Sequence, residues 1–461
     1  MFSSAMDWGK EIGLQLLSWR GEVGRGVYAS AGFVLFFLKW NLDRLMSGYF
    51  FSASWLPYQY LLPGTELQDK ENLALMLLIT ALPFIYIGVL LTAKRLRAIG
   101  APTFLAGLFF MPFVNLIFFM VLSVLPSCKK GKAGEPPPPS WVLRFVPLTL
   151  WKSFFFAAGA SLLPCLLLLV IGVQLLNSYG WGVFVGLPFV QGLFTVLLHS
   201  CHQRRGYFHC LLVALSACGL FAACILLLAM EGFICLIMAA FIAVPLCVLG
   251  ASVGYFIQAT HHANRMPPVL LLALLLLMGF EKSESPKPVS FTVTSTIEVD
   301  APPKIVWQNV VSFSELPPVQ DWLFKTGLAY PIRAEIYGTG VGAVRHCEFS
   351  TGPFVEPITV WNEPTQLRFG VTAMPEPMQE WTFYKHIHPP HLDGYFETTQ
   401  GEFRLESLPN GRTRLDGTTW YQNDLSPTRY WKIWSDFLIH RIHLRVLKHV
   451  KQLSENEQLG E

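Results

Sequence analysis

The chain has 461 residues, of which 52% are hydrophobic and only 14% are charged. This composition is too apolar for an ordinary soluble protein and is typical of one with several membrane-spanning helices. Residues 1–288 carry 19 Lys and Arg against 11 Asp and Glu, whereas the remainder carries 15 against 20, so net charges of +8 and −5 follow. Phosphate backbones repel an acidic C-terminal part, so we do not expect nucleic-acid binding.

Six apolar segments have the roughly 20 residues that a membrane-spanning helix needs. They are residues 27–51, 73–93, 153–176, 182–199, 207–230 and 232–257. Basic residues lie near positions 20–25, 94–97, 129–132, 204–205 and 265, and all five groups can face the cytoplasm if the spans form hairpins. Residues 103–125 lie between two basic groups, which predicts a broken re-entrant segment; a single full span is the alternative.

Two features of the apolar runs could carry chemistry. Glu231 is the only acidic residue between two long apolar runs, and it is either a buried proton-relay group or part of a turn with Gly232 at the outer interface. We favour the turn. Eight of the nine cysteines lie in or beside the apolar runs without a CxxC pair, so we interpret them as packing residues rather than metal ligands.

These patterns divide the chain into an N-terminal membrane module (1–127), a basic and Pro-rich loop (128–150), a second membrane bundle (151–281), a linker (282–288), a C-terminal domain (289–455) and a short tail (456–461). Gly24-Arg25 and the run from Lys94 to Gly100 make residues 24–127 resemble the bacterial domain-of-unknown-function family 805. Arg97 and Ala98 stand where that family usually has His and Asp, so no role of those groups carries over.

The C-terminal domain alternates polar and apolar residues, which predicts strands. We expect a strand at 291–299, helical pieces at 304–311 and 319–327, strands at 332–337, 343–350, 354–361, 367–374, 394–408 and 412–421, and a long helix at 427–453. With the opening from Ile297 to Trp307 and the glycine pair in Gly338–Val344, the domain resembles the START-like/Bet v 1-like superfamily, also called SRPBCC or polyketide cyclase-type. The fold class is therefore an α-helical membrane bundle plus an α+β helix-grip domain.

The resemblance implies an apolar pocket between a curved sheet and the long helix, and aromatic residues are abundant enough to line it. A histidine-rich loop forms a second candidate feature, either a lid over the pocket or the donor set His386, His388, His391 and Asp393 of a Zn²⁺ or Cu²⁺ site. We favour the lid, and expect no metal and no cofactor. Candidate ligand-binding residues are Trp361, Phe369, Trp381, Phe383, Tyr384, His386, His388, His391, Asp393, Trp431, Trp434, Phe437 and Arg441.

We therefore expect an integral protein of the bacterial inner membrane whose C-terminal domain binds a hydrophobic small molecule or lipid. The alternatives are an enzyme that acts on a membrane-soluble substrate through the 386–393 loop, and a scaffold or regulator without a ligand. The side of the domain depends on residues 269–280, which reach only about 18 Å as a helix and fall short of the roughly 30 Å core. We give a slight preference to an extracytoplasmic domain.

Overall fold

The computed structural model describes residues 18–60, 71–111, 114–125, 127, 145–258, 267–283, 290–384, 387–392 and 394–460. Contacts divide the chain into two compact units, the first made of Met1–Cys224 and Ala239–Pro286 and the second of Ile225–Met238 and Lys287–Glu461. The linker predicted at 282–288 and the loop predicted at 128–150 lie largely outside the described residues. The segment 225–238, which joins two apolar helices, thus belongs with the C-terminal domain.

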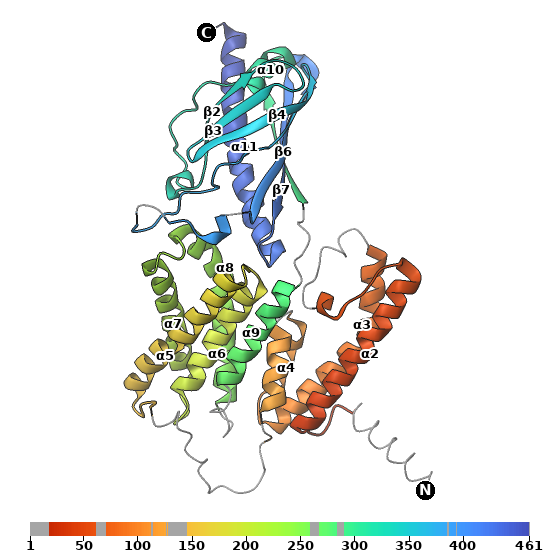
Figure 1. Cartoon of the computed structure of the whole chain (residues 1–461), viewed down its shortest axis with the longest axis vertical. Coiled ribbons are helices and arrows are strands. Elements are labelled where there is room, and N and C mark those ends of the chain that lie inside the picture. Colours follow the sequence, from red (N-terminus) through yellow and green to blue (C-terminus); the bar gives the residue numbers. More distant parts are fainter. Residues whose placement is uncertain are drawn as a thin grey trace. The chain divides into compact units, whose positions relative to one another are not determined.

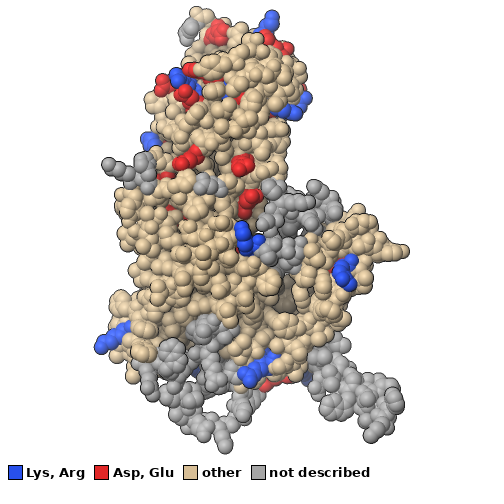
Figure 2. Space-filling model, viewed as in Figure 1, with Lys and Arg blue, Asp and Glu red and all other residues tan. Residues whose placement is uncertain are grey.

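Five helices in the described part of the chain are long and apolar enough to span a membrane. They correspond to the last five of the six predicted spans, and Figure 2 shows few charged residues on the visible surface of this apolar region. They are α3 (Glu71–Ala98), α5 (Leu150–Val170) continued by η5 (Ile171–Leu175), η6 (Gly182–Gly186) continued by α6 (Leu187–His199), α7 (Tyr207–Leu227) and α8 (Phe233–Ile257).

The first predicted span is α2 (Arg25–Phe51), a helix that buries charge in its middle. Lys39 and Asp43 form an ion pair one turn apart, and Thr80 on α3 donates its hydroxyl to Asp43 Oδ1 at 2.9 Å. A buried charged pair is tolerated in an apolar helix when its polar atoms have partners, and this pair has them.

Two shorter segments complete the first unit. Residues 103–125 form η3 (Thr103–Phe110) and α4 (Val114–Val124), so the predicted interruption is present, while entry and exit on one face of the membrane stays a prediction. Helix α9 (Pro267–Ser283) has 17 residues, a length of about 25 Å at the usual rise. Its Glu281 carboxylate accepts hydrogen bonds from the Trp181 and Gly182 amides at 2.7 and 3.1 Å.

The C-terminal domain contains one antiparallel sheet of seven strands in the order β1-β7-β6-β5-β4-β3-β2 (Figure 1). The strands are β1 (Ser290–Val299), β2 (Pro331–Tyr337), β3 (Val344–Phe349), β4 (Gly352–Asn362), β5 (Gln366–Gly370), β6 (Phe396–Ser407) and β7 (Thr413–Asn423). The predicted number of strands is confirmed. The strand predicted at 367–374 ends at Gly370, and the helical piece predicted at 319–327 is only the turn η8 (Phe324–Thr326).

The long helix α11 (Thr428–Leu459) packs against the sheet together with α10 (Pro303–Val311), which is the helix-grip arrangement that the sequence predicts (Figure 1). The C-terminal half of α11 contributes Val446, Leu447 and Val450 to a buried apolar core. Leu415 on β7 is fully buried in the same core, so this end of the domain is closed by side chains.

A buried ion pair lies inside this core. Arg345 on β3 pairs with Glu356 on β4, and both side chains are almost inaccessible to water. The guanidinium also donates Nε–H to the Val311 carbonyl at 3.2 Å. Its carbon lies 5.4 to 5.7 Å from the ring centres of Phe313, Phe369 and Phe403. The charge is thus held by one carboxylate and three aromatic faces.

N-terminal to these core residues of α11, the interface between the helix and the sheet contains polar side chains. His443 Nδ1 lies 3.0 Å from the Ser295 hydroxyl on β1, and Nε2 lies 2.7 Å from the Thr419 hydroxyl on β7. Burial, with a smaller contribution from the nearby His440, lowers the pKa of His443 to about 4. The ring is therefore neutral at pH 7, which fits its two hydroxyl partners.

We expect Glu356→Gln to lower the free energy of unfolding of the C-terminal domain by about 3–5 kcal/mol, because the Arg345 charge then stays buried without a counter-ion. The measurement is urea unfolding of a 287–461 fragment, which we expect to fold alone because it has its own core. The matched control is Glu348→Gln, which breaks the half-exposed pair of Arg333 and Glu348 and costs less than about 1 kcal/mol. Equal losses in the two variants would contradict the prediction.

We expect the stability of the domain to fall as the pH drops from 6.5 toward 4 through His443. The pKa of this ring in the folded state is below its ordinary value of 6.5, so the unfolded state binds more protons in this range. The stabilisation is complete above pH 6.5, and at most about 3 kcal/mol is lost by pH 4. The acid loss is smaller in His443→Gln, which cannot titrate. If His443→Gln lost as much unfolding free energy between pH 6.5 and pH 4 as the wild type, the proposed role of this ring would be refuted.

Candidate functional site

The segment 225–238 turns from α7 into α8, and the C-terminal domain caps both exposed helix ends. The amide of Phe233, the first residue of α8, donates to the Trp381 carbonyl at 2.9 Å. The Tyr384 hydroxyl donates to the carbonyl of Leu227, the last residue of α7, at 2.5 Å. The Tyr430 hydroxyl on α11 donates to the Met238 carbonyl. The Leu227 carbonyl and the Phe233 amide lie at helix ends and have no partner within their helices, so the first two bonds satisfy polar atoms beside apolar helices.

A short backbone bridge fixes the loop that reaches this turn. Leu328 pairs with Met378, and the Gln379 amide donates to the Gly327 carbonyl at 2.7 Å. Gly327 has φ +103°, and a Cβ on it would lie 1.9 Å from the Gln379 carbonyl oxygen. Only glycine fits this position, and it sets where the next residues, Glu380 and Trp381, are presented.

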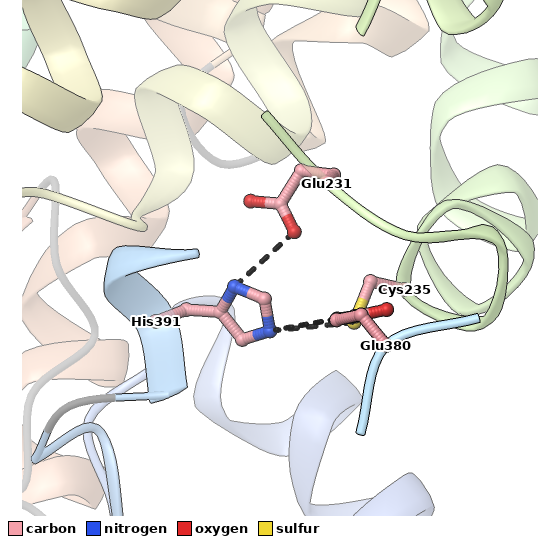
Figure 3. A group of neighbouring side chains, drawn as sticks. All are labelled: Glu231, Cys235, Glu380 and His391. Atoms are coloured by element: carbon pink, nitrogen blue, oxygen red, sulfur yellow. Dashed lines mark hydrogen bonds and ion pairs between the residues drawn. The ribbon is translucent and has the colours of Figure 1, made fainter. Parts of the chain in front are cut away.

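Four chemically active side chains meet between this loop and the turn: Glu231, Cys235, Glu380 and His391 (Figure 3). The imidazole lies in the middle. Its Nδ1 is 3.2 Å from Glu231 Oε2, while Nε2 is 3.3 Å from Cys235 Sγ and 3.7 Å from Glu380 Oε1. Cys235 Sγ also lies 2.8 Å from Glu380 Oε1. One donor atom of each residue lies within 4.8 Å of the others.

The cluster is withdrawn from water. The Glu380 side chain is completely buried, and its Oε2 has no hydrogen-bond partner among the described residues. Gly232 makes room for it, since a Cβ there would lie 1.8 Å from that oxygen. Burial raises the pKa of Glu380. Burial lowers the pKa of His391, but the Glu231 and Glu380 carboxylates outweigh it, so the pKa lies above its ordinary value.

The two described histidines of the histidine-rich loop, His388 and His391, have different carboxylate partners. His388 is half exposed and pairs through Nδ1 with Glu376 Oε1 at 3.1 Å, whereas His391 faces Glu231. His391 stands in the short helix η9 (Pro390–Leu392). His386 and Asp393 lie outside the described residues. The lid over a pocket stays a prediction.

The candidate aromatic residues lie in two places. Trp361 and Phe369 pack in the apolar core, where Trp361 meets Trp307 edge to face. Trp381 and Phe383 are 58% and 73% exposed on the loop next to the turn, and Tyr384 is partly exposed beside them. Both Trp381 and Phe383 contact the ring of Phe233, with ring centres 5.3 Å apart in each pair.

The remaining candidates lie on α11. Trp431 is buried, and Trp434 meets the partly exposed Phe437 edge to face. Arg441, another candidate ligand-binding residue, forms an ion pair with Asp321, with Nη2 and Oδ2 2.5 Å apart. The structure thus places its charge against the protein's own carboxylate.

Sequence reasoning found His391 and placed Glu231 at a turn, but it missed Cys235 and Glu380. By sequence Cys235 resembles the other packing cysteines, and Glu380 lies in a loop without a motif. The available signal was an acidic residue, Glu231, four positions before Cys235 and next to an apolar run. That spacing alone could not indicate a partner 145 residues away in the chain.

No known family model and no curated protein matches the chain, so the resemblance of residues 24–127 to family 805 has no support. Solved structures similar to the C-terminal region include a norcoclaurine synthase from Thalictrum flavum, with 13% identity, coverage of 37% of this chain and 98% of that chain, and a TM-score of 0.24. The Zhui aromatase/cyclase from Streptomyces sp. R1128 has 15% identity, coverage of 37% and 96%, and a TM-score of 0.25. Values this low say nothing about substrate or reaction; the helix-grip fold rests on the sheet order and on α11.

Proposed function

We propose that this chain is an integral membrane protein whose helix-grip domain binds a hydrophobic small molecule or lipid at the membrane surface. The observation that carries the proposal is the hydrogen bonding of the domain to the turn between α7 and α8, through Trp381, Tyr384 and Tyr430. These two helices are apolar enough to span a membrane, so their turn lies at its surface.

The chemistry of the loop supports contact with lipid. Trp381 and Phe383 are highly exposed beside the turn, and Leu227 and Leu228 are also exposed there. Trp and Tyr rings favour the interface between water and lipid, where one part of the ring system is apolar and another can form hydrogen bonds. A bilayer would cover this apolar surface, and an apolar ligand would reach the domain without crossing water.

The position of this turn also indicates on which side of the membrane the domain lies. Arg204 and Arg205 precede α7, and Arg265 follows α8. The start of α7 and the end of α8 are therefore flanked by basic residues, which favour the cytoplasmic side. The turn at 228–232 then lies on the opposite side, and the domain that caps it lies there too. Helix α9, at about 25 Å, is nearly long enough to return the chain across the roughly 30 Å core.

The enzyme alternative depends on the 386–393 loop, and the arrangement gives that loop less support. His388 and His391 interact with different carboxylates, Glu376 and Glu231. A general base near a pocket would need one histidine to be oriented toward a substrate position. Binding without a reaction of this loop is therefore the simpler function.

We expect lipid to co-purify with the full-length chain, and we expect the double variant Trp381→Ser and Phe383→Ser to retain about tenfold less of it. Losing two exposed aromatic contacts at an apolar surface is worth about 1.4 kcal/mol or more, which corresponds to this factor. The measurement is native mass spectrometry after gentle release from membranes. Tyr337→Ser, which removes an aromatic side chain of similar exposure from β2, is the matched control. Equal lipid in all three proteins, or none in the wild type, would count against the proposal.

We expect a reporter fused after Glu461 to lie on the extracytoplasmic side. An alkaline phosphatase fusion at this position should be active, and a fluorescent-protein fusion that folds only in the cytoplasm should be dark. Fusions within the loop that contains Arg204 should give the reverse result. Cytoplasmic activity at both positions would show that the proposed orientation is incorrect.

A further inference from the structure

The donor atoms around His391 have the chemistry of a transition-metal site. We propose that Cys235, Glu380 and His391 bind one Zn²⁺ ion, or a closely similar first-row transition-metal ion, and that Glu231 orients the histidine. The proposal is independent of the ligand of the domain, and it replaces our expectation from the sequence that the chain holds no metal.

The placement of the two ring nitrogens assigns these roles. Nε2 of His391 faces Cys235 Sγ at 3.3 Å and Glu380 Oε1 at 3.7 Å, so three donors of different residues converge on one side of the ring. Nδ1 faces Glu231 Oε2 at 3.2 Å on the other side (Figure 3). A histidine that binds a metal commonly donates its second N–H to a carboxylate, which fixes the tautomer and the ring orientation.

Burial supplies an independent argument. The Glu380 side chain is fully buried, and its Oε2 lacks a hydrogen-bond partner among the described residues. Two carboxylates and a thiol grouped away from water repel one another when ionised, and burying such charge is unfavourable unless a cation compensates it. A divalent ion bound through Glu380 Oε1 would provide this compensation.

The donor types select the metal. Thiolate, imidazole and carboxylate are the three ligand types that Zn²⁺ takes in proteins, whereas Ca²⁺ and Mg²⁺ prefer oxygen alone. Met378 Sδ, 3.6 Å from Cys235 Sγ, adds another soft atom at the edge of the cluster. Three protein donors leave a tetrahedral ion with one position for water or a ligand.

The location suggests what such an ion would do. Glu231 and Cys235 belong to the turn and first residues of α8, and Glu380 and His391 belong to the domain loop. An ion bound here would join two segments that are 145 residues or more apart in the chain. It would therefore reinforce the hydrogen bonds that hold the loop on the turn.

The test is elemental analysis of the full-length chain, purified in detergent, loaded with Zn²⁺ and dialysed against a weak chelator. We expect about one Zn²⁺ per wild-type chain, and little or none in Cys235→Ser, Glu380→Gln or His391→Ala, because each lacks one of three donors. Glu231→Gln should bind the ion about 10- to 100-fold more weakly and reach full occupancy at high Zn²⁺, as expected for an orienting carboxylate. His388→Ala is the matched control, since this histidine lies three positions away and pairs with Glu376.

Replacing zinc with cobalt provides a second measurement, which detects the bond between the metal and the thiolate directly. Co²⁺ bound to the wild type should give a thiolate-to-metal charge-transfer absorption that is absent in Cys235→Ser and present in His388→Ala. A wild-type chain without stoichiometric transition metal after loading would overturn the proposal. So would unchanged zinc content in both Cys235→Ser and His391→Ala, or binding of Ca²⁺ or Mg²⁺ alone.

Discussion

The hydrogen bonds between the C-terminal domain and the turn that joins α7 to α8 are the constraint on which the placement of the 378–392 loop depends. The last carbonyl of α7 and the first amide of α8 have no partner inside their helices, and both find one in the C-terminal domain. Such groups are costly to leave unpaired beside apolar surroundings, so the domain and the turn stabilise each other. This explains why residues 225–238 group with the domain rather than with their own helices.

The loop that makes these contacts is held from behind. Gly327, with its positive φ, lets the backbone approach Gln379 closely, and the bridge between Leu328 and Met378 aligns the residues that follow. Glu380 and Trp381 are adjacent in the chain, but the Glu380 side chain lies in the buried cluster and the Trp381 side chain is exposed. One backbone geometry therefore serves both the candidate metal site and the aromatic surface.

The contacts between α11 and the sheet are apolar in one part of the helix and polar in another. The C-terminal half of the helix packs apolar side chains into the core that also holds Arg345 of β3. Near the middle of the helix, His443 lies between the hydroxyls of Ser295 and Thr419. Buried polar groups that are fully hydrogen-bonded specify a unique arrangement more than they add stability. In Figure 2 acidic and basic side chains are spread over the visible surface of the domain.

Local periodicity in the sequence predicts the class of the protein and most of its elements. Long apolar runs require helices in lipid, and alternation of polar and apolar residues with Gly and Pro turns requires strands, because both patterns follow from local periodicity. The seven strands and α11 were predictable for this reason. Tertiary structure alone decided that His391 faces Glu231 while His388 does not, and that Cys235 and Glu380 join the cluster. Contacts between residues far apart in the chain leave no local period, and a single cysteine in an apolar helix reads as packing until its neighbours from another segment are known.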